Sequence, residues 1–170
     1  AQAKQLPLLV LGGGSNVLVS DEGYEGLVVH IQLRGVTFSD VSADTVEVTA
    51  AAGEVFDEVV AATVADGLWG LENLSLIPGS VGATPVQNVG AYGVEVADVI
   101  VRVVVFNTAS RRSEILEASA CAFQYRDSVF KHPAGAQYII TSVTFTLSRH
   151  AKPKVSYADL AVLADSEILP

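Results

Sequence analysis

The stretch that most constrains the fold of this chain runs from Leu71 to Val96 and reads LENLSLIPGSVGATPVQNVGAYGVEV. It is long and apolar, it carries almost no charge, and it is punctuated by Gly79, Gly82, Gly90 and Gly93. Disordered segments need low hydrophobicity and high net charge, and this stretch has neither. Because glycine lacks a Cβ and lets the backbone lie close against a ligand, we expect an ordered functional loop that offers N–H and C=O groups to something flat and large.

Composition narrows the class of protein. The 170 residues suffice for one ordinary domain or two small lobes, and 50% of them are hydrophobic. Ten basic against nineteen acidic residues give a net charge of −9, which argues against nucleic-acid binding because phosphate neutralisation needs clustered Lys and Arg. No apolar run reaches the roughly 18 residues of a membrane span, and no signal peptide is apparent. We therefore expect neither a nucleic-acid nor a membrane partner.

The sulfur and imidazole side chains predict no metal site. The single cysteine, Cys121, excludes an internal disulfide and is expected to be a small buried residue. His30, His132 and His150 are scattered without metal-ligand spacing and are expected on the surface or at strand ends. Trp69 is expected in the core.

Hydrophobic periodicity predicts a strand-rich chain with few helices. Strands are expected over 6–11, 17–19, 27–31, 45–49, 96–106, 113–116 and 137–147. In the last of these, Ile139, Thr141, Val143, Phe145 and Leu147 should share one face. A helix is expected over 54–66 with Gly67 as its C-terminal stop, a helical turn over 118–122, and a short amphipathic helix over 157–164.

This order of elements predicts an α+β fold with two small lobes and a largely antiparallel second sheet. The first lobe is expected over 1–67, and the glycine-punctuated loop with the second lobe over 68–150. Residues 151–170 would begin a connection to a further substrate domain, and both ends of the chain are expected to be cuts through a longer protein. The loop would then lie between the lobes, where ligand sites commonly form.

A second glycine-rich segment, LGGGSN over 11–16, directly follows an expected strand. Successive backbone N–H groups in such a turn form a concave anion site, and Ser15 and Asn16 add side-chain donors. The segment is not a Walker A loop, because the Lys-Ser/Thr pair is absent, and no helix follows as in the dinucleotide fingerprint. A phosphate or pyrophosphate site and a plain glycine-rich turn both fit it.

The segment FQYRDS contains Arg126 between Tyr125 and Asp127. An arginine fixed by a neighbouring carboxylate is a preorganised cation for a developing oxyanion. An ordinary surface contact between Arg126 and Asp127 is the alternative.

Taken together, GGGSN, the 71–96 loop and CAFQYRDSVFK, in this order and spacing, resemble the UDP-N-acetylenolpyruvoylglucosamine reductase family, flavoenzymes of bacterial peptidoglycan precursor synthesis. The combination of IPGxVGAxPxQNxGAYG with YRDSxFK is far more specific than either motif alone. The resemblance implies an FAD-binding fold of the PCMH, or vanillyl-alcohol-oxidase, type with the flavin between two lobes. It also implies NADPH as co-substrate, a cytoplasmic location and a monomer.

The resemblance also implies roles for individual residues. The FAD pyrophosphate would be held by Gly12, Gly13, Gly14, Ser15 and Asn16. The flavin would be lined by Pro78, Gly79, Ser80, Gly82, Ala83, Thr84, Gln87, Asn88, Gly90, Ala91 and Tyr92. The strand containing Ile139 and Val143 would close on the flavin from the other lobe. Tyr125 and Arg126 match the catalytic YR pair, in which the arginine stabilises negative charge.

The implied reaction has two steps. NADPH reduces FAD, and the reduced flavin passes hydride to the enolpyruvyl group of UDP-N-acetylglucosamine enolpyruvate, giving UDP-N-acetylmuramate. The proton-donating serine of the family, in a GSFFKNP-like motif, and its catalytic glutamate have no match in this sequence. Ser128 is expected to cap a helix or turn instead. We therefore expect no full turnover from this chain alone. The alternatives are another FAD-dependent oxidoreductase of the same superfamily and a non-catalytic fragment that keeps the fold.

Overall fold

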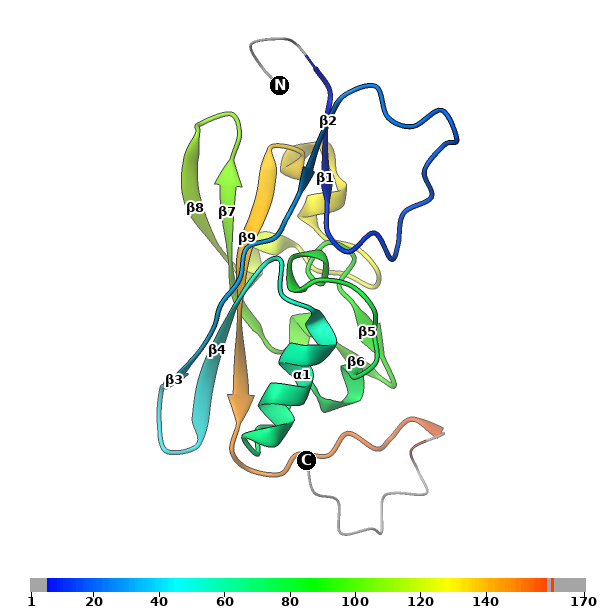
Figure 1. Cartoon of the computed structure of the whole chain (residues 1–170). Helices are drawn as coiled ribbons and strands as arrows, with labels where there is room; N and C mark the ends of the chain where they lie inside the picture. The colour runs from blue at the N-terminus through cyan, green and yellow to red at the C-terminus, as the bar shows by residue number, and fades with distance from the viewer. Residues whose placement is uncertain (1–5, 159, 161–170) are drawn as a thin grey trace.

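The main element of the molecule is a five-stranded antiparallel sheet (Figure 1), seen in a computed structural model that describes residues 6–158 and residue 160. Its strands, in spatial order, are β3 (Val36–Asp40), β4 (Thr45–Ala51), β9 (Tyr138–Ser148), β7 (Ile100–Asn107) and β8 (Arg112–Glu117). The sheet has a largely antiparallel character as expected. The helix predicted over 157–164 falls mostly outside the described residues.

A second, smaller sheet lies across one end of the molecule (Figure 1) and contains two parallel strands, β1 (Leu8–Leu11) and β2 (Leu27–His30). The strand β4 pairs along its whole length with β9, so residues 36–51 belong to the large sheet. The expected lobe boundary at residue 67 stays a prediction. Periodicity predicted β4 as a strand but could not show that its partner lies about a hundred residues further along the chain.

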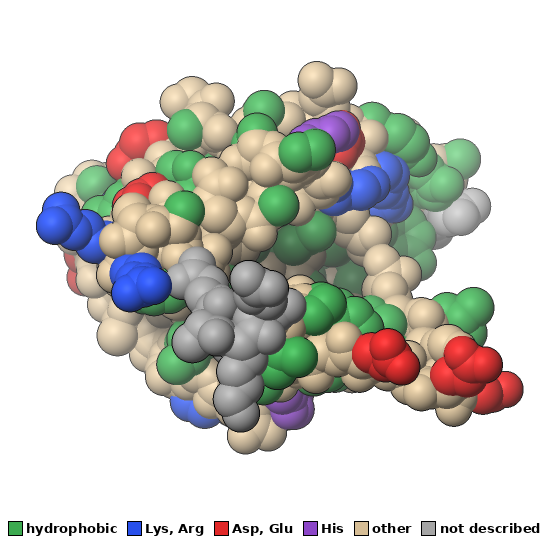
Figure 2. Space-filling view, turned by 90° about the horizontal axis from the view of Figure 1, so that it is seen from above, with side chains coloured by type: hydrophobic (Ala, Val, Ile, Leu, Met, Phe, Trp, Pro, Cys, Tyr) green, Lys and Arg blue, Asp and Glu red, His purple; other side chains and the backbone are tan. Residues whose placement is uncertain are grey.

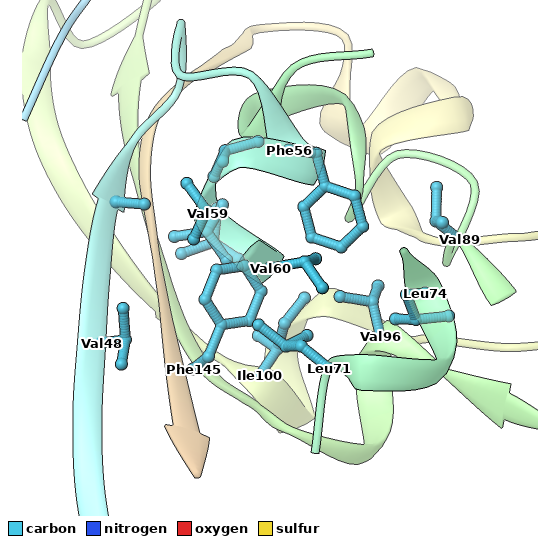
Figure 3. Close-up of a cluster of buried hydrophobic side chains, with 14 of the residues drawn as sticks. Val48, Phe56, Val59, Val60, Leu71, Leu74, Val89, Val96, Ile100 and Phe145 are labelled. Carbon is cyan, nitrogen blue, oxygen red and sulfur yellow. The ribbon is translucent and has the colours of Figure 1, made fainter. Parts of the chain in front are cut away.

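The helix α1 (Phe56–Ala65) packs against one face of the large sheet, and this contact forms the core. Phe56, Val59 and Val60 of the helix lie in one buried cluster with Val48 and Phe145 of the sheet (Figure 3). Burying such a side chain stabilises the fold by about 1.5–3 kcal/mol. The helix was predicted correctly, and it ends before a glycine with φ of +70°, as the stop signal indicated. Among the described residues, no helix has the length and apolar character to cross a bilayer.

A β-bulge changes the expected alternation of β9. The pairing to β7 shifts between Val104, which faces Ser142, and Val105, which faces Ile140, so Thr141 is an extra residue. Its hydroxyl donates to the Val104 carbonyl at 3.1 Å. Val143, Phe145 and Leu147 are buried as predicted, but upstream of the bulge Ile140 is buried rather than Thr141.

Three other strand predictions differ from the structure. Residues 17–19 form no strand, and Leu18 is fully exposed there, because no neighbouring strand in the described chain pairs with the segment. The strand β3 was not predicted, since its last residues are polar and its pairing to β4 depends on the intervening turn. The strand expected from residue 96 begins only at Ile100, because Val96–Asp98 forms a 3-10 turn closed by a capping box between Glu95 and Asp98.

The predicted strands at β1, β2, β4 and β8 are confirmed, as is the helical turn after β8. The remaining elements are short and shape the site. They are the 3-10 turns η2 (Glu72–Leu74), η3 (Val81–Ala83), η4 (Val96–Asp98), η5 (Ala118–Cys121), η6 (Val129–Lys131) and η7 (Pro133–Gly135), and the two-residue strands β5 (Gly90–Ala91) and β6 (Val94–Glu95).

Candidate cofactor-binding and active site

The glycine turn over 12–16 and the loop over 77–89 face each other across a cavity of about 300 Å³. A second cavity of about 250 Å³ shares Val10, Gly12 and Ser80 with the first and extends toward β9. We call these two cavities together the groove. Seen from above, this end of the molecule is hollowed, and hydrophobic side chains gather around the hollow (Figure 2). The groove thus lies where the small parallel sheet meets the large one.

The two walls of the groove approach too closely for side chains at their glycines. A Cβ added to Gly12 would lie 2.5 Å from the Ser80 hydroxyl oxygen. Gly79 has φ of +127°, and a Cβ there would lie 3.2 Å from the Ser15 hydroxyl oxygen. The walls are also joined by the Asn16 Nδ2, which donates to Gln87 Oε1 at 3.0 Å. The sequence predicted both glycine segments, and the structure brings them together.

The loop is ordered because the connection between β4 and α1 fixes its backbone. The amides of Val81 and Gly82 donate to the carbonyls of Glu54 and Ala52, each at 2.9 Å. A Cβ on Gly82 would lie 2.6 Å from the Ala52 Cβ, so this glycine permits close packing on the core side. Thr84 is buried, and its hydroxyl donates to the Val81 carbonyl at 2.8 Å. The long apolar loop is therefore ordered, as its composition indicated.

Asn88 joins the loop to the segment containing Arg126. It is buried, with φ of +45°, and its Nδ2 donates to Glu95 Oε2 at 2.8 Å and to the Gln124 carbonyl at 3.0 Å. Its Oδ1 accepts from the Ala97 amide at 3.0 Å. With all these bonds made inside the protein, Asn88 positions the backbone and lines neither part of the groove.

Tyr125 and Arg126 form the tip of a tight hairpin. The backbones of Gln124 and Asp127 exchange hydrogen bonds at 3.0 and 3.1 Å, and Arg126 has φ of +54°. The Arg126 guanidinium donates to the Gly90 carbonyl at 2.7 Å and lies 5.7 Å from the centre of the Tyr125 ring. Tyr125 is 81% exposed. The hairpin thus presents an exposed cation that is held by a backbone carbonyl.

We call the surface around this hairpin the mouth. It encloses about 550 Å³ and is lined by Tyr125, Arg126, the 90–95 segment, Asp98 and Tyr157. Of the residues predicted to line the flavin, Gly90, Ala91 and Tyr92 lie here and not in the groove. Tyr92 and Tyr157 pack edge to face, with ring centres 5.7 Å apart.

The alternative of an Arg126–Asp127 surface pair is not what the structure contains. Asp127 instead accepts from His132 Nε2 at 2.8 Å. This hydrogen bond, together with one from the Ser128 amide, holds the pKa of Asp127 below its usual value, and Lys131 and His132 add favourable charge. The carboxylate therefore orders the base of the hairpin, and within the described part of the chain the guanidinium has no acidic partner.

Several lining residues were not singled out from the sequence. Val10, Ile31, Phe130, Tyr138 and Ile140 add apolar surface to the groove, and Lys131 adds a cation. The apolar ones carry no signal beyond hydrophobicity, whereas Lys131 lies within the CAFQYRDSVFK motif.

The strand β9 supplies one of its two predicted site residues to the groove. Ile139 lines it, but Val143 is fully buried in the core and lines no part of it. Ser128 caps η6, as expected. Its hydroxyl donates to the Val86 carbonyl at 2.6 Å and accepts from the Phe130 amide at 3.3 Å.

The expectations that Cys121 and Trp69 are buried are confirmed. Cys121 is buried, and burial, with the nearby Glu117 charge, raises its pKa to about 11. Trp69 is buried in the core region. The described part of the chain contains no group of three or more His, Cys, Asp or Glu side chains that could hold a metal ion.

The groove fits a flavin nucleotide on three observations. The glycine turn lines the groove together with Ser15 and Asn16, and backbone N–H groups of such a turn suit a diphosphate. The opposite wall is apolar and fixed, which suits a flat ring system. The mouth beside it holds an exposed guanidinium, which suits a carboxylate of a second reactant.

Comparison with known proteins identifies the family of the chain. A family model described as FAD binding domain matches residues 1–112, and the chain belongs to this family. The chain is 49% identical over 154 residues to the UDP-N-acetylenolpyruvoylglucosamine reductase of Neisseria gonorrhoeae, covering 91% of this chain and 44% of that protein. The Thermobifida fusca reductase of the same name is 44% identical over 156 residues, covering 91% of this chain and 43% of that protein.

Solved structures agree with this result. The crystal structure of the Thermus caldophilus reductase matches with a TM-score of 0.67 and 30% identity, over 95% of this chain and 55% of that chain. A solvent-stable cholesterol oxidase matches with a TM-score of 0.60 but 12% identity, over 87% of this chain and 31% of that chain, which shows a shared fold alone. The predicted resemblance and fold class are confirmed. The chain spans about half the length of the curated relatives that it matches.

Proposed function

We propose that this chain is the FAD-binding part of an enzyme that uses NADPH to reduce UDP-N-acetylglucosamine enolpyruvate to UDP-N-acetylmuramate. The observation that carries the proposal is the meeting of the glycine turn and the 77–89 loop in one groove, with Arg126 held at the adjacent mouth. The similarity to reductases of this name supports the choice of substrates. We further propose that the protein acts as a monomer in the cytoplasm.

The chain's own residues would bind, orient and stabilise charge. The amides of the glycine turn would hold the diphosphate of FAD, with Ser15 and Asn16 as additional donors. The fixed backbone around Gly79 and Ser80 would line the ring. FAD, when bound, would supply the chemistry of hydride transfer between NADPH and the enolpyruvyl group.

Arg126 would receive the substrate carboxylate. Its guanidinium is exposed, is held by the Gly90 carbonyl and has no acidic partner among the described residues. Tyr125 lies beside it and would shield the carboxylate from water on one side. One well-placed donor to a developing negative charge is commonly worth about 3 kcal/mol of transition-state stabilisation. Arg126 would therefore act on the rate of substrate reduction and not on the binding of FAD.

The first test is the binding of FAD by the purified chain. We expect flavin absorbance to stay with the protein after desalting, at one FAD per chain. A colourless preparation that also fails to quench added FAD fluorescence would contradict the proposal and favour a fragment that keeps only the fold.

The second test distinguishes this reaction from that of another FAD-dependent oxidoreductase. In the protein that carries this chain, reduced flavin should be reoxidised without oxygen only when the enolpyruvyl substrate is added. Arg126→Met should slow this step at least a hundredfold while leaving reduction by NADPH and FAD binding nearly unchanged. Reoxidation by an unrelated small molecule would favour the alternative. The chain alone is expected to show no steady-state turnover.

A further inference from the structure

We infer that Lys131 is a positioning residue that links occupancy of the groove to the conformation of the Arg126 hairpin. This inference rests on the proposed function, because it concerns the anionic part of the bound flavin nucleotide. Lys131 ends the short turn η6 and lines the groove opposite the glycine turn. Among the described residues that line the two cavities of the groove, it is the only charged one.

The ammonium of Lys131 already makes one bond that matters for the active site. Its Nζ donates to the backbone carbonyl of Arg126 at 2.9 Å. Arg126 has φ of +54°, a conformation that non-glycine residues rarely adopt and that costs free energy unless neighbouring contacts hold it. The bond from Lys131 is one such contact, and the bond from the Arg126 guanidinium to Gly90 is another.

An ammonium has three N–H donors. One of them is used by the Arg126 carbonyl, and the described chain supplies no second hydrogen-bonded acceptor to Lys131. Asp127 is near enough for the Lys131 charge to lower its pKa, but its closest partner is His132. Two donors of Lys131 thus remain for a ligand in the groove.

A flavin nucleotide offers two anionic groups, the diphosphate and the ring in its reduced form. Either can accept from Lys131, because both present negatively charged oxygen or nitrogen to a cation. Binding of such a group would fix the long lysine side chain, and the fixed ammonium would in turn hold the Arg126 carbonyl. Filling the groove would therefore order the hairpin that carries the guanidinium, before any substrate arrives.

The test compares Lys131→Met, Lys131→Arg and the unchanged chain. Lys131 is exposed, so removing its charge leaves the core intact and the variants should fold. Lys152→Met is the matched control, since it removes the same charge from a position that does not line the groove. FAD binding is measured by fluorescence titration in both redox states. We expect Lys131→Met to weaken binding about tenfold and Lys131→Arg to restore most of it.

The redox dependence identifies the anionic partner. Equal weakening in both states assigns Lys131 to the diphosphate. Weakening that is tenfold greater for the reduced state assigns it to the ring, and the reduction potential of the bound flavin then falls by about 30 mV. If Lys131→Met binds FAD as tightly as the unchanged chain in both states, the inference is wrong. If the unchanged chain itself does not bind FAD, the proposed function fails instead.

Hydrogen exchange tests the link to the hairpin without any activity measurement. The amides of Gln124 and Asp127 form the two bonds at its base. FAD should slow their exchange in the unchanged chain and in Lys152→Met, but much less in Lys131→Met at saturating FAD. Equal protection in Lys131→Met would show that Lys131 binds the nucleotide without ordering the hairpin, and would overturn the coupling.

Discussion

The two sheets of this protein differ sharply in how they are packed. In the large sheet, one face is covered by α1, and Val48, Val143 and Phe145 are fully buried. In the parallel pair β1–β2, by contrast, Leu8, Leu27 and Val28 are each about 40% exposed. The groove lies between the two sheets. Its wall on the side of the large sheet is fixed by the core, whereas its wall on the side of the small sheet is held by few contacts.

This difference shows which part of the site is preorganised. Backbone hydrogen bonds to the β4–α1 connection attach the 77–89 loop to the large sheet and fix its conformation. The glycine turn is held across the groove mainly by Asn16 and by close backbone approach. Regions with few buried apolar contacts open more readily than a core. A nucleotide bound between the walls would therefore add most stability to the small sheet.

The largest expected effect comes from the same substitution made in each sheet. Val143→Ala removes two methyl groups from a fully buried site and should lower the free energy of unfolding by about 2–3 kcal/mol. Val28→Ala, at 43% exposure in β2, should cost less than about 1 kcal/mol. Urea unfolding followed by Trp69 fluorescence measures both. Equal losses would mean that the small sheet is packed as tightly as the large one.

Val143→Ala also separates two roles for this residue. It was predicted to contact the flavin, but its side chain is buried in the core and does not line the groove. Once stability is accounted for, its FAD affinity should match that of the unchanged chain, whereas Ile139→Ala should weaken binding.

Most of the fold could be predicted from local patterns, but the pairing of strands could not. Helical spacing located α1, and apolar runs bounded by glycine located β1 and β2. Nothing local indicated that β4 pairs with β9, because the two are separated by the whole loop and β7–β8. The bulge at Thr141 was also invisible, since it arises from the register of β7 and leaves the alternation in the sequence unbroken.

The candidate site shows the same limit. The two glycine segments and the Tyr125–Arg126 pair were predicted from motifs. The structure brings the two glycine segments together in one groove. Which residues of a motif line the groove and which only hold the backbone depends on tertiary contacts. Asn88 holds backbone and lines neither cavity, and Thr84 lines the groove while its hydroxyl bonds to a backbone carbonyl. Lys131 reaches the groove through a short turn that no periodicity indicates.

The second prediction concerns the contact between the two walls. Gly12→Ala places a Cβ 2.5 Å from the Ser80 hydroxyl oxygen, while the nearest atom to a Cβ on Gly13 is 3.9 Å away. The hydroxyl can rotate, so Gly12→Ala should cost little stability but should widen or distort the cradle. We expect FAD affinity to fall about tenfold, or about 1.4 kcal/mol, and Gly13→Ala to have the smaller effect. The two affinities are compared by fluorescence titration. The reverse order would show that the walls do not meet at Gly12.

The smallest expected effect is a change in thermal stability caused by Asp127, at the base of the Arg126 hairpin. The pKa of Asp127 is lowered in the folded protein, chiefly by the hydrogen bond from His132. Its contribution to stability is therefore present above the unfolded-state pKa of about 3.9 and is lost as pH falls through the lower folded-state pKa. Asp127→Asn should lower the thermal midpoint slightly at pH 7, and the two curves should converge on acidification.

The control for this prediction is Asp21→Asn, which removes an exposed carboxylate that has no side-chain hydrogen bond or ion pair within the described part of the chain. Its thermal midpoint should follow that of the unchanged protein at every pH, offset by at most a constant. If Asp127→Asn is as stable as the unchanged protein at pH 7, the His132 bond stabilises nothing measurable. The hairpin would then be held by its bonds to Lys131, Asn88 and Gly90, that is, by the groove and the loop.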